Sequence, residues 1–314
     1  MEREAALRAL VETAYGAEVT ALASIAHHAF EDRVIRRVDL AGRPPAVLRA
    51  FTGSVRGWLL DQAAALDLVE ARGFPAPRVI RTSAGEPVAA HGPWSGLLLT
   101  FVEGAEADFE PATLAALAAH AAELHALPAD PALPPSRLTP VPPLPGLPPP
   151  GRVPGAARAF HRSAVETMRR MAGWERLPTA TLHGDCWPAN AVRTPGGGIA
   201  MIDWEGAGRG PAVLELGYLL VGAHLGRRQL PAIRPDPERI AAVMRGYASV
   251  RRPTGEELAW LPDAVRWDVV MRAAQSDAFA AGEERWRDDL WLGKSVARNA
   301  ASDEIARIAR ACVA

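Results

Sequence analysis

Hydrophobic and polar positions follow two different patterns along the chain, one before and one after about residue 102. Up to about residue 102, short apolar stretches are separated by polar turns such as Ala41-Gly42-Arg43, which is typical of β-strands. One helical stretch, 58–71, interrupts them and ends before Gly73-Phe74-Pro75, and another covers 1–15. The predicted strands are 19–25, 34–40, 46–51, 78–82 and 96–102. We therefore expect a five-stranded antiparallel sheet with one helix inserted after its third strand.

After Gly104 the helical period dominates, which makes the predicted fold class α+β. The expected helices are 112–127, 156–173, 238–249, 256–281 and 290–311. Twelve of the 28 prolines fall in 127–154 and exclude a helix or a central strand there. The first interpretation of this segment is a stiff, polyproline-like connection on the surface, and a docking peptide for a partner is the alternative.

Composition narrows the function classes. The 314 residues are 49% hydrophobic and 23% charged, as in globular proteins, and 35 basic against 36 acidic residues leave no overall footprint for nucleic acid. Two cysteines, Cys186 and Cys312, exclude a disulfide framework and fit a reducing compartment. Charges in the first ten residues, and the lack of any long apolar run, argue against a signal peptide or membrane anchor. We expect a cytoplasmic protein with neither nucleic-acid nor membrane partners; its oligomeric state is not indicated.

The candidate chemistry lies in residues 181–205, which read TLHGDCWPAN, then a hairpin over 190–193 and 198–202, then the end of IDWE. Asp185 and Asn190 flank a short turn shaped by Pro188, and the hairpin should carry Asp203 back beside Asn190. Two carboxylates and an amide oxygen suit Mg²⁺, which keeps its other positions for water and phosphate oxygens. A lone Asp in a turn is usually a structural cap. The combination of His-Gly-Asp, Asn and a later Asp favours a catalytic site instead.

The motifs HGDCWPAN and IDWE resemble those of the aminoglycoside phosphotransferase family, whose relatives include choline, homoserine and methylthioribose kinases. The resemblance covers nearly the whole chain and implies a two-lobed, protein-kinase-like fold. It implies an N-terminal nucleotide-binding lobe over 1–102 and a C-terminal catalytic and acceptor-binding lobe over 103–314. It also implies transfer of the γ-phosphate of ATP or GTP to the hydroxyl of a small molecule, with Mg²⁺.

The resemblance assigns roles to individual residues. Asp185 is the expected catalytic residue that orients the hydroxyl or accepts its proton, and Asn190 and Asp203 are the expected metal ligands. His183 is expected to hydrogen-bond the loop backbone, and Glu215 stands where the family often has Asp. The expected nucleotide contacts are Arg49, Gln62, the hinge residues Thr100, Phe101 and Val102, and Ile202.

Three departures from the family pattern lie in the first lobe. Arg49 replaces the usual strand lysine, and it either binds phosphate through its larger fork or is a surface strand residue. Gln62 stands where a helix glutamate would pair with that cation. The segment 25–32, expected to cover the phosphates, has no glycine but includes His27 and His28. These departures leave a second hypothesis open: a nucleotide-binding pseudokinase or scaffold with little or no turnover.

The acceptor is expected to bind near the C-terminus. Residues 256–291 hold nine acidic and four basic residues and four tryptophans. Carboxylates interleaved with aromatic faces suit a cationic acceptor, such as an amine-bearing antibiotic. The alternative is that the carboxylates are solvated and the tryptophans pack in the core.

Overall fold

The computed structural model describes residues 2–25, 32–141, 147–149, 151, 153, 157–226, 233–276, 293, 296 and 298–313. By its internal contacts the chain divides into two compact units. Unit 1 consists of Met1–Ala105 and Val192–Trp204, and unit 2 of Glu106–Ala191 and Glu205–Ala314. The first break lies three residues after the expected lobe boundary, and the hairpin before Asp203 groups with the N-terminal residues. The assignment of nucleotide and acceptor binding to the lobes 1–102 and 103–314 stays a prediction.

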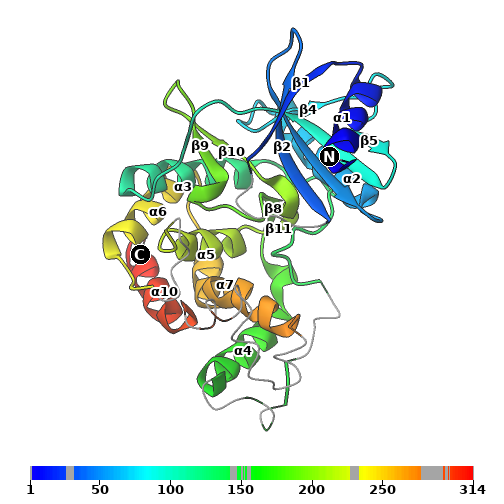
Figure 1. Cartoon of the computed structure of the whole chain (residues 1–314). Coiled ribbons are helices and arrows are strands. Elements are labelled where there is room, and N and C mark those ends of the chain that lie inside the picture. The colour runs from blue at the N-terminus through cyan, green and yellow to red at the C-terminus, as the bar shows by residue number, and fades with distance from the viewer. Residues whose placement is uncertain are drawn as a thin grey trace. The chain divides into compact units, whose positions relative to one another are not determined.

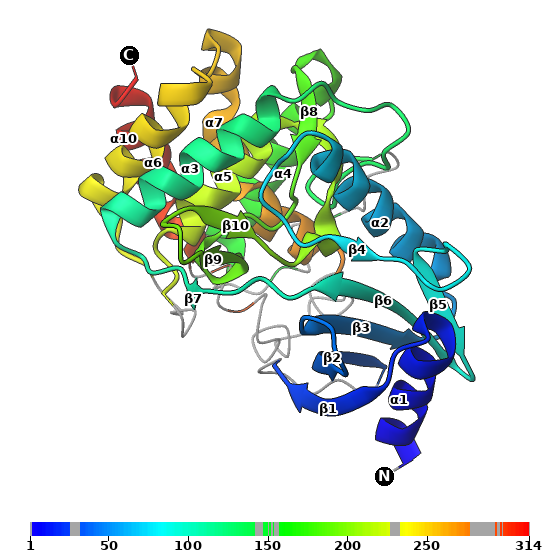
Figure 2. The ribbon, with the colours of Figure 1, turned by 90° about the horizontal axis from the view of Figure 1, so that it is seen from above.

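Unit 1 is built on an antiparallel sheet of six strands (Figure 1), in which β1, β2, β3 and β6 lie side by side (Figure 2). Its strands are β1 (Val19–Ser24), β2 (Arg33–Leu40), β3 (Ala46–Thr52), β4 (Val79–Ile80), β5 (Val88–His91) and β6 (Trp94–Thr100). The expected antiparallel sheet is confirmed, but five strands were too few. The missed strand is β5, which forms a hairpin with β6 and has only four residues, too few for a clear alternation.

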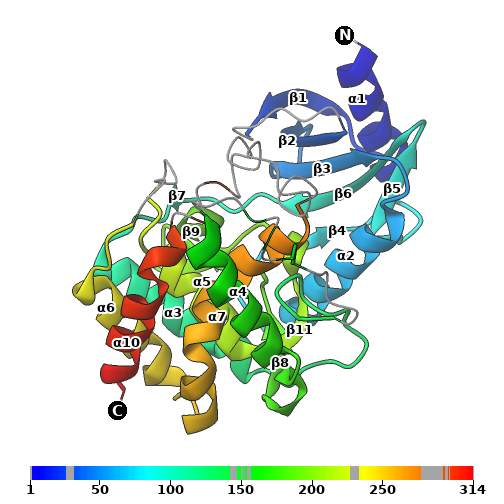
Figure 3. The same ribbon diagram turned by 90° about the horizontal axis from the view of Figure 1, so that it is seen from below.

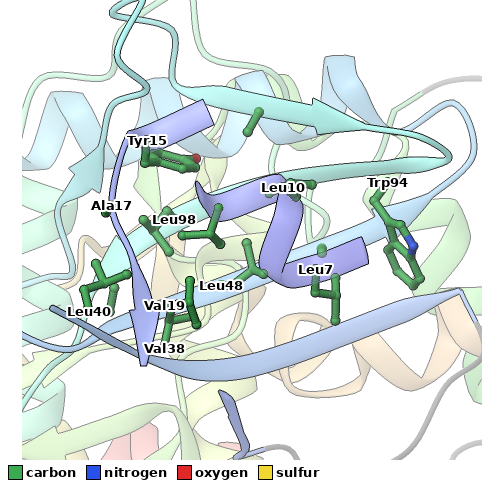
Figure 4. Close-up of a cluster of buried hydrophobic side chains, with 14 of the residues drawn as sticks. Leu7, Leu10, Tyr15, Ala17, Val19, Val38, Leu40, Leu48, Trp94 and Leu98 are labelled. Carbon is green, nitrogen blue, oxygen red and sulfur yellow. The ribbon is translucent and has the colours of Figure 1, made fainter. Parts of the chain in front are cut away.

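One face of this sheet is covered by α1 (Glu2–Tyr15), whose Leu7 and Leu10 are fully buried against the strands (Figure 4). Leu48 of β3 and Leu98 of β6 belong to the same cluster. Because side chains alternate along a strand, Arg49 must point to the opposite face of the sheet. The second helix of this unit is α2 (Arg56–Ala71), whose Trp58 packs edge-to-face on Phe51, at 4.9 Å between ring centres.

Unit 2 is mainly helical, with α3 beside α6 and both α5 and α10 beside α7 (Figure 3). Its helices are α3 (Pro111–Ala126), α4 (Arg158–Met171), α5 (Ala212–Gly222), α6 (Pro237–Val250), α7 (Gly255–Ala274) and α10 (Ser302–Ala311). A strand pair, β8 (Thr179–Leu182) with β11 (Gly208–Pro211), lies among them. Of the helices expected at 256–281 and 290–311, residues 277–281 and most of 290–297 lie outside the described residues. Every described helix is too short or too polar to cross a bilayer.

The proline-rich segment corrects one expectation. Its described part does not run wholly over the surface: Leu133, Ser136 and Leu138 are each at most 4% exposed, although neighbours such as Ala132 and Val141 are exposed. A parallel bridge joins Pro135 to Arg209 at β11. Prolines exclude regular helix and central strand, but they do not prevent a chain from packing against a strand whose glycines leave room for it.

Candidate active site

The loop His183-Gly184-Asp185 follows β8 directly and depends on a glycine. Gly184 has φ +82, a left-handed conformation that side chains disfavour. A Cβ at this position would also overlap the backbone of Gly206. The N–H of Asp185 donates to Nδ1 of His183 at 3.2 Å. This contact confirms that His183, which is fully buried, bonds to the loop backbone.

A buried carboxylate anchors this loop from α5. Glu215 accepts hydrogen bonds from the N–H groups of His183 at 3.0 Å and Gly184 at 2.5 Å, and His125 Nε2 lies 2.8 Å from the same carboxylate. Burial would raise the pKa of Glu215, but its hydrogen bond and charge interaction with His125, and the contribution of His183, lower it below 4.5. The carboxylate therefore stays ionised and fixes the loop.

Asp185 carries three side-chain contacts. Asn190 Nδ2 donates to its Oδ2 at 2.7 Å and to its backbone oxygen at 3.0 Å. Tyr218 Oη and Arg137 Nη2 both donate to its Oδ1, each at 2.5 Å. The short turn over Pro188 thus does return the Asp185 and Asn190 side chains to one place, as the sequence predicted. The carboxylate remains 27% exposed, enough to be reached by a small molecule.

Tyr218 and Arg137 were not predicted from the sequence. Tyr218 lies one helical turn after Glu215 on α5, so the helical spacing would have placed it near the loop if that helix had been predicted. Burial and the neighbouring Asp185 raise the pKa of Tyr218, so its hydroxyl remains a donor. Arg137 is the one charged residue between Asp130 and Arg152, a signal that the proline-rich context concealed.

A pocket in unit 2 is lined in part by Tyr218, the tyrosine that donates to Asp185. Its described lining residues are Trp187, Tyr218, Val221, Gly222, Leu225, Val265, Asp268, Val269, Arg272, Arg298, Asn299 and Ser302. Two aromatic side chains, Trp187 and Tyr218, form part of the wall, and Tyr218 links the pocket to Asp185. Asp268 is held by Arg272 at 2.8 Å. Burial would raise the pKa of Asp268, but Arg272 and Arg137 lower it.

Two predicted site residues of unit 1 form a second ion pair, besides the one between Arg137 and Asp185. Arg49, on β3, donates from Nη1 to Oδ1 of Asp203 at 2.7 Å, and its side chain is only 4% exposed. It is therefore not a surface strand residue. Asp203 has φ +66 and is the one non-glycine residue with positive φ in the described part of the chain. Such strain is uncommon outside glycine and tends to mark functional sites.

A short hairpin and a buried tryptophan fix the position of Asp203 within unit 1. Strands β9 (Ala191–Arg193) and β10 (Ile199–Met201) pair, and half-buried Ile202 connects β10 to Asp203. Trp204 Nε1 donates to the carbonyl of Met201 at 2.9 Å, and its ring packs on Phe74. The neighbouring tryptophan therefore anchors the strained residue.

The predicted helix and hinge residues of unit 1 differ in what they can offer a nucleotide. Gln62 is 3% exposed on α2, and neither polar atom of its amide finds a hydrogen-bond partner among the described residues. At the end of β6 the N–H of Thr100 donates to the carbonyl of Arg78, and the N–H of Phe101 donates to the carbonyl of Pro45. No backbone hydrogen bond between described residues uses the N–H of Val102. Of the three hinge residues, Val102 is thus the one with a free backbone donor.

The donor atoms suit a hard divalent cation. Asn190 uses Nδ2 in both of its hydrogen bonds to Asp185, which leaves its carbonyl oxygen out of those bonds. The other candidate metal ligand, Asp203, offers the oxygens of a carboxylate. Carboxylate and amide oxygens are ligands of Mg²⁺ and Ca²⁺, and Mg²⁺ is commonly held by one or two carboxylates with water and phosphate completing its shell.

Comparison with known proteins agrees with this architecture. The model of a phosphotransferase enzyme family matches residues 23–261. A search of curated protein sequences gives no significant match. Among solved structures, amicoumacin kinase hAmiN, in complex with AMP-PNP, Ca²⁺ and Ami, is similar at 15% identity, with a TM-score of 0.67 over 98% of this chain and 96% of that one.

Two further structures share the fold. A microcompartment-associated aminopropanol kinase has 16% identity and a TM-score of 0.63, and a spectinomycin phosphotransferase, in complex with ADP and spectinomycin, has 13% and 0.60. Each alignment covers 98% of this chain and 97% of the other. At these identities the similarity establishes the kinase-like α+β fold.

Proposed function

The chain belongs to the phosphotransferase enzyme family, known also as the aminoglycoside phosphotransferase family, and we propose that it moves the γ-phosphate of ATP or GTP to a hydroxyl of a small molecule with Mg²⁺. The observation that carries the proposal is the arrangement at Asp185. A partly exposed carboxylate is held by three donors, and one of them, Tyr218, also lines a pocket with aromatic side chains in its wall. A group placed in this way can orient a hydroxyl and accept its proton.

The proposed nucleotide site uses residues of unit 1. Arg49 supplies a buried cation for phosphate oxygens, and the free N–H of Val102 suits a base in the hinge formed with Thr100 and Phe101. Ile202 stays a proposed contact of the nucleotide. Gln62 is proposed to support the nucleotide site only by packing within unit 1. Asn190 and Asp203 are the proposed metal ligands, and a bound Mg²⁺ would neutralise charge on the phosphates. A cytoplasmic location, where nucleoside triphosphates are abundant, is part of the proposal.

The proposed acceptor site is the pocket that Tyr218 links to Asp185. The acidic composition of 256–291 does not by itself make it a site for amines. Glu257 is bound to Arg251, and Asp263 lies 2.9 Å from Arg170. Asp268 does face the pocket, but it is bound to Arg272. An amine-bearing acceptor therefore stays one hypothesis within the wider class of small hydroxyl compounds.

Calorimetric titration of ATP and Mg²⁺ tests the proposed roles. We expect metal-dependent binding to the wild type, retained in Asp185→Ala and lost in Asp203→Ala. Glu166→Ala, on α4 and outside both motifs, with a side chain 58% exposed, is the control and should bind normally. Equal loss of binding in the Asp185 and Asp203 variants would contradict the assignment. Failure of the wild type to bind any nucleoside triphosphate would contradict the proposed function itself.

A further inference from the structure

We propose that Arg137, from the proline-rich segment, is a positioning residue that holds the Asp185 carboxylate in the orientation needed for phosphoryl transfer. The inference rests on the proposed function, since it assigns a role at the same site. Its basis is a set of contacts made by one guanidinium and by the backbone on either side of it.

All three nitrogens of the Arg137 guanidinium face groups of this site. Nη2 donates to Asp185 Oδ1 and Nε donates to the carbonyl of Gly184, each at 2.5 Å. Nη1 lies 3.6 Å from Asp268 Oδ1. The guanidinium also lies over the ring of Tyr218, 5.1 Å from its centre. Arginine suits this place because its planar fork reaches several acceptors at once.

These contacts fix the rotation of the carboxylate. Arg137 and Tyr218 both donate to Oδ1, while Asn190 donates to Oδ2. Turning the carboxylate would break contacts to both of its oxygens. A reacting group that is misplaced by about 1 Å can lose on the order of 10²-fold in rate, so such a restraint matters for catalysis.

The backbone around Arg137 is itself held in place. The N–H of Arg137 donates to the carbonyl of Gly206 at 3.1 Å, and Ser136 Oγ donates to the same carbonyl at 2.8 Å. Arg209 makes two backbone hydrogen bonds to this segment: its carbonyl accepts from the N–H of Ser136, and its N–H donates to the carbonyl of Pro134. Leu138 accepts a hydrogen bond from Trp267 Nε1 at 2.7 Å. The segment therefore presents Arg137 from a fixed backbone.

Three glycines at every second position make room for this segment. A Cβ at Gly206 would lie 2.6 Å from Arg137 Cδ. At Gly208 it would clash with the backbone of Pro134 and Ser136, and at Gly210 with the side chain of Thr139. Residues 206–210, Gly-Ala-Gly-Arg-Gly, are called here the glycine strip. Because its three glycines have no side chains, residues 134–139 can pack closely against it. Two separate stretches of sequence are matched to place one arginine against Asp185.

Charge keeps the arrangement intact. Burial would lower the pKa of Arg137, but Asp185, Tyr218 and Asp268 raise it, so the guanidinium stays protonated. The motif HGDCWPAN carries no lysine or arginine of its own between Asp185 and Asn190. Arg137 supplies a cation at the carboxylate from elsewhere in the chain.

The test compares Arg137→Ala and Arg137→Lys with Arg169→Ala, a control at a helix position whose side chain is 69% exposed. Transfer from γ-labelled MgATP to amicoumacin, spectinomycin or aminopropanol is measured, with thermal melting as a check on folding. We expect kcat to fall about 10²-fold in Arg137→Ala while the KM for MgATP is unchanged. Arg137→Lys should lose less, and added guanidinium should restore part of the kcat of Arg137→Ala.

A second readout does not depend on turnover. In protein labelled with ¹⁵N-arginine, the Nη resonances of Arg137 should be resolved by restricted rotation and should coalesce in Asp185→Ala. A wild-type kcat in Arg137→Ala, or a loss that neither lysine nor guanidinium reduces, overturns the proposal. So does an Arg137 spectrum that Asp185→Ala leaves unchanged. A wild type that transfers phosphate to no acceptor contradicts the proposed function, and the spectrum then decides the Arg137 contact separately.

Discussion

Arg49 Nη1 and Asp203 Oδ1 are 2.7 Å apart although 154 positions separate the two residues in sequence. The arginine side chain is almost wholly buried and the aspartate is 36% exposed. A phosphate-binding cation and a metal-binding carboxylate, as we propose them, therefore contact each other directly within unit 1. The contact helps to hold Asp203 in its left-handed conformation.

Arg49→Met should weaken binding of MgATP by about tenfold or more, because a charge-assisted hydrogen bond contributes on the order of 1.5–3 kcal/mol. Arg49→Lys, which keeps the charge but lacks the fork, should lose less. Calorimetry gives both affinities, and Arg36→Met on the neighbouring strand is the control. Unchanged affinity in Arg49→Met would show that this cation does not serve the nucleotide.

Tyr218→Phe should lower kcat by about tenfold, the effect of one hydrogen bond of roughly 1.5 kcal/mol to a charged group. The phenylalanine ring keeps the wall of the pocket and the surface beneath Arg137, so the KM of the acceptor should change little. Steady-state kinetics measure both parameters. Tyr15→Phe, in the hydrophobic cluster of unit 1, is the matched control and should behave as wild type. A normal kcat in Tyr218→Phe would show that the Tyr218 hydroxyl does not contribute to catalysis.

Gln62→Leu should raise the free energy of unfolding by about 1–2 kcal/mol, because it removes a buried amide that has no hydrogen-bond partner among the described residues. If Gln62 contributes only packing, MgATP affinity should stay the same. Urea unfolding and calorimetry measure the two effects. A more stable protein that no longer binds nucleotide would instead establish a direct contact between Gln62 and the ligand.

Glu215→Gln should destabilise unit 2 by about 3 kcal/mol at neutral pH, because it breaks a buried, hydrogen-bonded charge interaction. The folded state holds the pKa of Glu215 below 4.5, so the wild type gains this stability above that pH. The gain is lost as the pH falls through the lower, folded-state value. Urea unfolding at several pH values should show the two proteins converging in acid. A constant difference down to strongly acidic pH would contradict the role of the ionised carboxylate.

The elements with a strong local pattern were predictable. Short apolar stretches between polar turns were enough to place β2, β3 and β6, and longer helical stretches placed α3, α6 and α7. The turn between Asp185 and Asn190 followed from its length and its proline. The strand β5 was missed because four residues carry too little periodicity. The helix α5 was missed because Ala212–Gly222 is apolar on most sides, so no polar face marked it.

The candidate site was only half predictable for a related reason. Asp185, Asn190 and Asp203 lie in a motif whose spacing is visible along the chain. Arg137 reaches Asp185 across 48 positions, through a glycine strip that local patterns do not connect to it. Long-range packing between two irregular segments leaves no periodic signal, so such a contact becomes visible only in three dimensions.

The central claim is that this chain transfers phosphate to a hydroxyl through Asp185, and transfer of label from γ-³²P-ATP tests it most directly. Wild type, Asp185→Ala and Asp185→Asn are incubated with Mg²⁺ and a panel of hydroxyl compounds, amine-bearing and amine-free, and the products are separated. We predict a labelled, phosphatase-sensitive product from at least one acceptor with the wild type and none with either variant, although both still bind MgATP. A wild type that binds MgATP but labels nothing, or an Asp185→Ala variant that transfers label at the wild-type rate, would contradict the account.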